Sequence, residues 1–97
     1  MAEKCPADKA LEWGLINRVV EDDRLLPEAR ELAATLATGP TVSIALIRKA
    51  YWNSLDNNYP EQLELEAVLQ RQAGQTDDFR EGVAAFLEKR PTRFSGK

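Results

Sequence analysis

Most of the chain follows the 3.6-residue period of amphipathic helices. Residues 25–37, 60–73 and 78–90 each place apolar side chains three or four positions apart, on one face of a helix. Residues 41–55 are apolar nearly all round, which predicts the most buried helix of the chain. In the last of these windows we expect burial of Phe79, Val83, Phe86 and Leu87.

The first twenty residues follow a different pattern. Pro6 and Gly14 bracket a short helix over residues 7–13, because proline suits a helix start and glycine a helix end. Residues 15–20, from Leu15 to Val20, are rich in β-branched side chains and predict a strand. A lone strand cannot pair its own backbone groups, so it needs a partner outside this chain or in a second copy. The expected fold is all-α, a small bundle of four to five short helices with one short strand candidate near the N-terminus.

Two features near the end of the sequence predict how the last helix begins and ends. Asp78 is followed three residues later by Glu81, a spacing typical of a capping box at a helix start. Residues 90–97 are polar and contain proline and glycine, which predicts a loosely held tail.

Composition excludes several kinds of site. None of the 97 residues is histidine, which removes imidazole acid–base catalysis and imidazole metal ligation. Cys5 is the one cysteine, so neither an internal disulfide nor a multi-cysteine zinc site can form. The five glycines are scattered and form no phosphate-binding loop. We therefore assign no catalytic residue and no metal ligand to this chain.

Charge and hydropathy exclude two kinds of partner. The formal net charge is -3, and basic and acidic residues alternate along the chain. Nucleic-acid binding needs clustered lysine and arginine, so no nucleic acid is expected as a partner. No apolar run approaches the roughly 18 residues of a membrane span, and no apolar region of signal-peptide type begins the chain. We expect a cytoplasmic protein without membrane contact.

Four segments resemble a known family when taken in order: residues 7–20, 32–40, 63–72 and 78–97. The first ends in Gly-Leu-Ile-Asn followed by a β-branched pair, and the last reads DFREGVAAFLEKRP and then FSGK. In this order and spacing the segments resemble the C-terminal part of the enoyl-CoA hydratase/isomerase (crotonase) family. Trp13 and the composition of residues 56–66 resemble its ring-opening phenylacetyl-CoA isomerase branch.

The resemblance implies that residues 1–97 are the C-terminal helical region of such an enzyme, concerned with assembly and with capping acyl-CoA. The N-terminal catalytic α/β core, which in the family acts on a thioester enolate, would lie outside them. The parent would be a hydratase (a lyase) or an isomerase in fatty acid or phenylacetate metabolism, with a coenzyme A thioester as substrate. This chain alone is expected to be inactive and to hold no cofactor. Family members form trimers or hexamers, so self-association is expected.

One pair of residues matches the family's contact with coenzyme A. Phe86 and Lys89 correspond to an aromatic residue and a lysine on the last helix that reach the adenosine end of the ligand, often bound to the adjacent subunit. Residues three apart share a helix face, an aromatic ring can cover an adenine, and an ammonium can meet nucleotide phosphates. In the competing interpretation, Phe86 continues the core made by Phe79 and Val83, and Lys89 is a solvated charge near a helix end.

A second class of function stays open. The chain can instead be a stand-alone helical protein-interaction module without enzymatic activity, binding a partner through an exposed apolar stripe. The strand predicted at residues 15–20 separates the two, because a complete module would not normally keep an unpaired strand. Trp13 and Trp52 are further candidates for lining an acyl pocket, against the commoner role of a helical tryptophan in packing.

Overall fold

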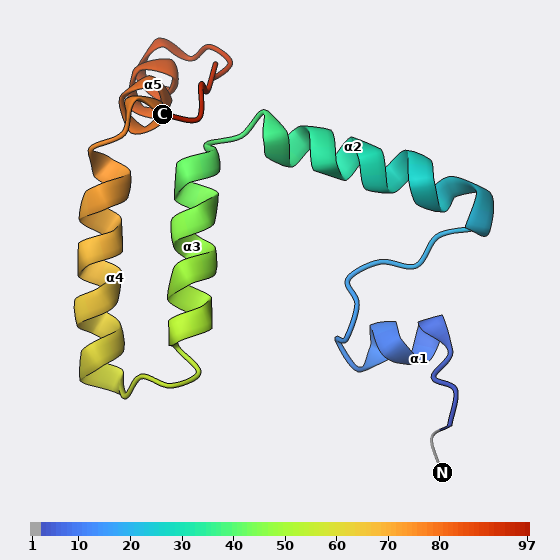
Figure 1. The fold of residues 1–97 in the computed structure, drawn as a ribbon. Helices are drawn as coiled ribbons and strands as arrows, with labels where there is room; N and C mark the ends of the chain where they lie inside the picture. The colour runs from blue at the N-terminus through green and yellow to red at the C-terminus, as the bar shows by residue number, and fades with distance from the viewer. Residues whose placement is uncertain (1–2) are drawn as a thin grey trace. The chain divides into compact units, whose positions relative to one another are not determined.

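The computed structural model describes residues 3–97, and its regular elements are all helical. Five α-helices follow one another in this part of the chain: α1 (Ala7–Glu12), α2 (Leu25–Ala37), α3 (Thr41–Asn53), α4 (Tyr59–Gly74) and α5 (Asp77–Glu88). A short 3-10 helix, η1 (Asp22–Arg24), leads directly into α2. The all-α class predicted from the sequence is confirmed (Figure 1).

The strand predicted at residues 15–20 is wrong, since residues 3–97 contain no strand. The amide at its start helps to close α1 instead: Leu15 N–H donates to the Ala10 carbonyl at 2.9 Å, next to the bond from the preceding Gly14 N–H to the Leu11 carbonyl at 3.0 Å. Gly14 adopts φ +71, as this helix end requires. β-Branched composition alone does not make a strand where no second strand supplies hydrogen bonds.

The chain divides into two compact units, Met1–Leu32 and Ala33–Lys97. In the first unit, Arg18 lies beyond the end of α1 and pairs with Glu28 near the start of α2, with Nη1 and Oε2 3.0 Å apart. Arg24 Nη2 lies 3.8 Å from the other oxygen of Glu28. These partly exposed ion pairs connect the segment after Gly14 to the first turns of α2.

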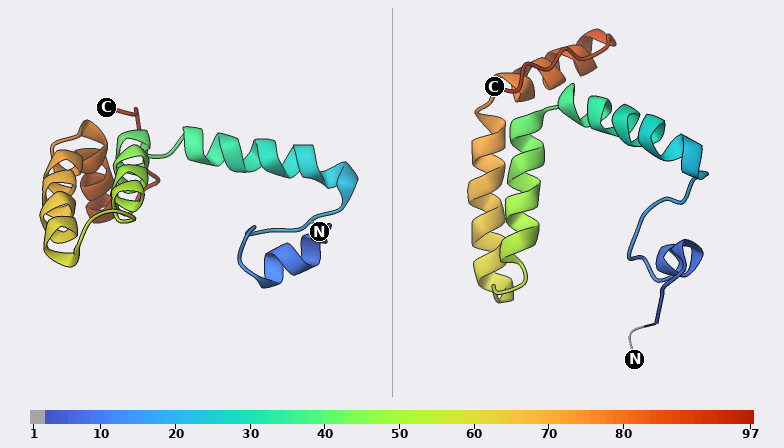
Figure 2. Two further views of the ribbon diagram at one scale, coloured as in Figure 1. Left: turned by 60° about the horizontal axis from the view of Figure 1, so that its bottom comes forward. Right: turned by 45° about the vertical axis from the view of Figure 1, so that its right-hand side comes forward.

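In the second unit, α3 and α4 lie side by side and run in opposite directions, which both views of the ribbon show (Figures 1 and 2). An Asn58–Glu61 capping box starts α4, with Asn58 Oδ1 accepting from Glu61 N–H at 3.1 Å and Glu61 Oε2 accepting from Asn58 N–H at 3.0 Å. Gln62 on α4 donates from Nε2 to the Ala50 carbonyl of α3 at 3.2 Å. Leu69 of α4 is 5% exposed and is the buried leucine of this pair.

Burial in α3 and α5 departs from the prediction. No residue of α3 is fully buried, although its sequence predicted the most buried helix. In α5 the buried residues are Asp78 and Ala85, while Phe79, Val83, Phe86 and Leu87 are all exposed. The apolar faces form as the periodicity predicts, but the described part of the chain does not cover them.

The segment after α5 is held firmly, which corrects the prediction of a loose tail. Asp78 lies in the first turn of α5 and is 2% exposed. Its carboxylate accepts from the backbone N–H groups of Ser95 at 2.6 Å and of Gly96 at 2.9 Å, and its own N–H donates to the Lys97 carbonyl at 3.0 Å. Residues 90–97 therefore run back along α5 (Figure 2).

Two glycines allow this close approach. A Cβ at Gly82 of α5 would lie 3.7 Å from the Phe94 ring, so the returning segment packs against the helix at this position. Gly96 adopts φ +74, and a Cβ there would lie only 2.8 Å from Thr41 Oγ1 at the start of α3. Any side chain at position 96 would be strained by its backbone conformation and would push against α3.

The capping box predicted at Asp78 and Glu81 is also wrong. Thr76 caps α5, with its Oγ1 accepting from Phe79 N–H at 3.0 Å. The two acidic side chains are left to hold the returning segment instead.

We predict that Asp78→Asn loosens this segment. An amide presents one acceptor oxygen, so one of the two backbone N–H groups loses its partner and faces an NH₂ group. A hydrogen bond to a charged group contributes about 1.5–3 kcal/mol, so amide hydrogen exchange at Ser95 and Gly96 should accelerate about tenfold or more. Asp77→Asn is the matched control, because Asp77 pairs only with the exposed Arg80. Unchanged exchange at both amides in Asp78→Asn would contradict this role.

Candidate functional site

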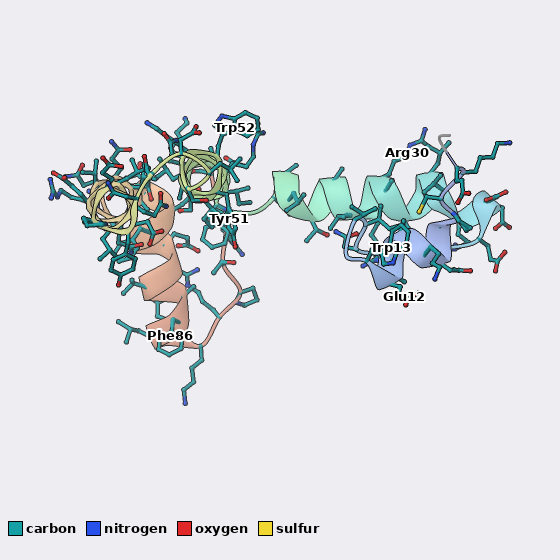
Figure 3. The ribbon with its side chains drawn as sticks, turned by 90° about the horizontal axis from the view of Figure 1, so that it is seen from below. Glu12, Trp13, Arg30, Tyr51, Trp52 and Phe86 are labelled. Atoms are coloured by element: carbon teal, nitrogen blue, oxygen red, sulfur yellow. The ribbon has the colours of Figure 1, made fainter. Side chains whose placement is uncertain are left out.

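The predicted coenzyme A pair lies at the far end of α5. Phe86 is 82% exposed, and Figure 3 shows its ring at the end of α5 that is remote from α3 and α4. Lys89 is also exposed. The interpretation of Phe86 as a core residue is therefore wrong for the described chain, in which Ala85 is the buried neighbour.

Lys89 sits in an unusual backbone turn that ends α5. It adopts φ 54 and ψ 40, the left-handed region, and no other non-glycine residue among residues 3–97 has a positive φ. Arg90 N–H donates to the Ala85 carbonyl at 3.0 Å, and Lys89 N–H donates to the Phe86 carbonyl at 3.3 Å. These two bonds form the Schellman motif, in which glycine usually occupies the left-handed position.

The same motif ends α1, where the left-handed residue is Gly14. A residue with a Cβ pays an energetic penalty in this conformation of about 1–2 kcal/mol. Such a conformation persists only where surrounding contacts fix it, and it is typical of ligand-binding positions. Lys89 therefore needs contacts that hold the turn.

Those contacts come from Glu81 and Arg90. The Arg90 guanidinium binds the Glu81 carboxylate through two parallel bonds, Nη1 to Oε1 at 2.7 Å and Nη2 to Oε2 at 2.9 Å. Its Nε donates to Glu88 Oε2 at 2.6 Å, and Arg93 N–H donates to Glu81 Oε1 at 2.7 Å. We call these residues, Glu81, Glu88, Arg90 and Arg93, the Glu81 clasp.

The charges of Glu81 and Arg90 are stable at neutral pH. The hydrogen bond from the Arg90 side chain, followed by that from the Arg93 backbone, lowers the pKa of Glu81 to about 2. The hydrogen bonds to Glu81 and Glu88 raise the pKa of Arg90. Both partners are thus fully ionised, and a bidentate arginine–carboxylate pair is geometrically specific as well as strong.

Lys89 differs from Arg90 in having no ion-pair partner within residues 3–97. The site thus presents an open aromatic ring and an uncommitted ammonium at positions 86 and 89. This combination suits a ligand that has both a flat aromatic group and a phosphate. It contains no group arranged for acid–base or nucleophilic chemistry.

The two tryptophans considered for an acyl pocket lie in different units. Trp13 is exposed in the first unit, with Lys9 Nζ 5.8 Å from the centroid of its ring. Trp52 is exposed on α3, where it lines a shallow hollow of about 740 Å³ with Arg48 and Leu55. Figure 3 labels both rings. Neither belongs to an enclosed pocket, and neither packs in a core.

A second hollow lies between α3 and α4, and sequence reasoning did not identify it. Its volume is about 590 Å³, and its walls are mainly apolar, with Gln62 and Glu66 contributing polar atoms. The sequence signal that could have indicated this hollow is the apolar character of residues 41–55 on all sides of the helix, which implies that more than one face of the helix is covered. Its apolar walls include Leu46, Ile47, Ala50, Leu69, Ala73 and Phe79.

The described residues contain neither a cluster of metal-ligating side chains nor a helix suited to cross a membrane. Between residues 3 and 97, no three acidic, cysteine or histidine side chains gather as a metal site would need. None of the helices in that range is both long and apolar enough to cross a bilayer.

Comparison with known sequences identifies the family. All of residues 1–97 match the family described as enoyl-CoA hydratase/isomerase. A protein of Rhodobacter capsulatus named probable enoyl-CoA hydratase is 49% identical over 96 residues, covering 99% of this chain and 37% of that protein. The 1,2-epoxyphenylacetyl-CoA isomerase of Escherichia coli K12 is 44% identical over 97 residues, covering 100% of this chain and 37% of the relative.

Solved structures agree with the sequence comparison. The crystal structure of an enoyl-CoA hydratase/isomerase from Mycobacterium paratuberculosis matches with a TM-score of 0.90 at 32% identity, covering 98% of this chain and 37% of that one. The chain thus spans a little over a third of the length of the relatives that it matches. On these grounds, the chain belongs to the enoyl-CoA hydratase/isomerase family.

Proposed function

We propose that this chain is the C-terminal helical segment of a larger acyl-CoA hydratase or isomerase, where it serves assembly and caps the coenzyme A moiety of the substrate. The observation that carries the proposal is the lack of cover over its apolar helix faces. Leu69 and Ala85 are the buried hydrophobic residues of the described chain, while large apolar side chains on every α-helix are exposed. Such faces are typical of a segment that packs against a further scaffold.

The C-terminal placement rests on the order of the sequence segments, because the strand expected to separate this function from a stand-alone interaction module is absent from residues 3–97. The α/β core of the family supplies the backbone N–H groups that stabilise a thioester enolate, and the carboxylates that move protons. The described residues contain no comparable arrangement, so we assign the chemical step to that core. The substrate is an acyl-CoA thioester, and the parent handles it as a hydratase or an isomerase.

We predict that the 97-residue chain alone does not turn over crotonyl-CoA. An oxyanion-hole donor contributes about 2.7–4 kcal/mol to such reactions, and this chain offers neither the donors nor a proton-transfer group beside them. A coupled absorbance assay should give the rate of the buffer blank, with a full-length enoyl-CoA hydratase as the positive control. Turnover clearly above the blank would contradict the assignment of the chemistry to the core.

For the capping role, the support is the position of Phe86 and Lys89. The ring and the ammonium lie three residues apart at the exposed end of α5, and Lys89 has no carboxylate partner among the described residues. Coenzyme A presents an adenine and phosphates at its nucleotide end, which match these two groups. The acyl end of the ligand would lie in the core, so this chain contributes affinity but no chemistry.

We predict that coenzyme A shifts the backbone NMR resonances of residues 86–89, with a Kd on the order of millimolar because the core that holds the rest of the ligand is absent. Pantetheine lacks the nucleotide and should cause no shift there. Lys89→Ala should weaken binding at least threefold, whereas Lys49→Ala, an exposed lysine of α3, should not. Equal shifts with pantetheine, or no shift near Phe86, would count against the capping role.

The assembly role is supported by the apolar stripe of α2. Leu25, Leu26, Leu32 and Leu36 are all exposed, and the stripe of α4 over residues 63–73 is exposed at Leu63 and Val68. Contiguous apolar patches beyond a few hundred Å² usually mark an interface. We therefore propose that the chain associates with copies of itself through one of these stripes, as subunits of the parent would.

We predict concentration-dependent association in sedimentation velocity experiments. Leu32→Glu should weaken it about tenfold or more, since a carboxylate would be buried without a partner at the contact. Ala34→Glu introduces the same charge on the opposite side of α2 and should have little effect. Loss of association in Leu63→Glu instead would assign the contact to α4, and a monomer at all concentrations would refute the assembly role.

A further inference from the structure

The residue that holds the site in place is Glu81, which lies eight residues, a little over two helical turns, before Lys89. Its carboxylate binds both terminal nitrogens of Arg90, the residue that directly follows Lys89 in the chain. It also accepts from the Arg93 backbone N–H at 2.7 Å, which fixes the chain beyond the turn. Glu81 thus restrains both ends of the short segment that leaves α5.

These contacts fall where the backbone needs support. Lys89 occupies a left-handed position that glycine takes in the equivalent turn after α1. Residues with side chains occupy such positions only when neighbouring contacts determine the conformation. Arg90, which directly follows Lys89, is held by Glu81 and Glu88, so the clasp restrains the ψ angle of Lys89 and the direction in which the chain continues.

The clasp also pairs one of two adjacent cations, Arg90, and leaves the other, Lys89, without an ion-pair partner in the described chain. Arg90 is bound by Glu81 and by Glu88, with Nε and Oε2 of the latter pair 2.6 Å apart. Glu88 is the nearest carboxylate in sequence to Lys89, and its pairing with Arg90 leaves the Lys89 ammonium without a partner in the described chain. An uncommitted cation can pair with an incoming phosphate without first breaking an internal ion pair.

We propose that Glu81 is a positioning residue for coenzyme A, acting through Arg90 to hold Lys89 in its left-handed turn beside Phe86. The ammonium is then in place before the nucleotide phosphates arrive, and less conformational freedom is lost on binding. This role rests on the proposed capping function, because it concerns how the same site is organised. Glu81 itself does not contact the ligand.

Glu81→Gln tests the role, since an amide cannot form the doubly charged bidentate pair. In this variant the backbone chemical shifts of Lys89 should move toward values averaged over several conformations, and the Kd for coenzyme A should rise about three- to tenfold. Arg90→Lys, which keeps the charge and loses the planar fork, should change both readouts in the same direction. Glu64→Gln on α4 is the matched control and should change neither.

A double variant separates positioning from general stability. Lys89→Gly keeps the left-handed turn, because glycine adopts it freely, but removes the ammonium. Coenzyme A should bind it more weakly than the unmodified chain, and adding Glu81→Gln should cause no further loss. If Glu81 had a merely structural role, Glu81→Gln would weaken binding by the same factor in the unmodified chain and in Lys89→Gly. That result would overturn the proposal.

The remaining outcomes distinguish the capping function of the chain from the positioning role of Glu81. If the unmodified chain binds coenzyme A at residues 86–89 and Glu81→Gln binds it equally well, the positioning role alone is refuted. If the unmodified chain shows no coenzyme A shift at these residues, the capping function fails, and the positioning role fails with it, even where Glu81→Gln loosens the turn.

Discussion

Hydrogen bonds from the backbone of residues 93–96 to two acidic side chains of α5 organise the C-terminal half of this molecule. Asp78 and Glu81 lie three residues apart on α5; Asp78 accepts from the backbone N–H groups of Ser95 and Gly96, and Glu81 accepts from that of Arg93. A carboxylate that accepts several such bonds compensates for its partial burial and orders the segment that donates them. The turn at Lys89 and the packing of Phe94 on Gly82 both depend on this attachment.

The sequence predicted the helices well, because their periodicity is local. The expected windows for α2, α3, α4 and α5 match the observed helices to within a few residues. The failures concern what each segment bonds to or packs against, which the local pattern does not determine. Residues 15–20 have strand-like composition, yet their first amides close α1, and no second strand exists in the described chain. Asp78 and Glu81 have the spacing of a capping box, yet their partners lie up to eighteen residues away.

The candidate site was predictable only in part. The positions of Phe86 and Lys89 came from resemblance to the family, and their three-residue spacing is consistent with one helix end. The exposure of Phe86 could not be predicted, because its apolar character fits a core equally well. The left-handed turn at Lys89 had no local signal either, since lysine is an unusual residue there. It follows from the Glu81 clasp, which only the folded chain reveals.

The contact of Gly96 with Thr41 has a consequence for how this unit responds to stress. The chain runs from α3 through α4 and α5 and then returns to the first residue of α3. The first and last residues of this path, Thr41 and Gly96, are in contact, so the path closes on itself through a noncovalent contact rather than around a central core. Detaching the last few residues would therefore free α5 and the entry to α3 together, so that these elements should open as one cooperative foldon rather than fray from one end.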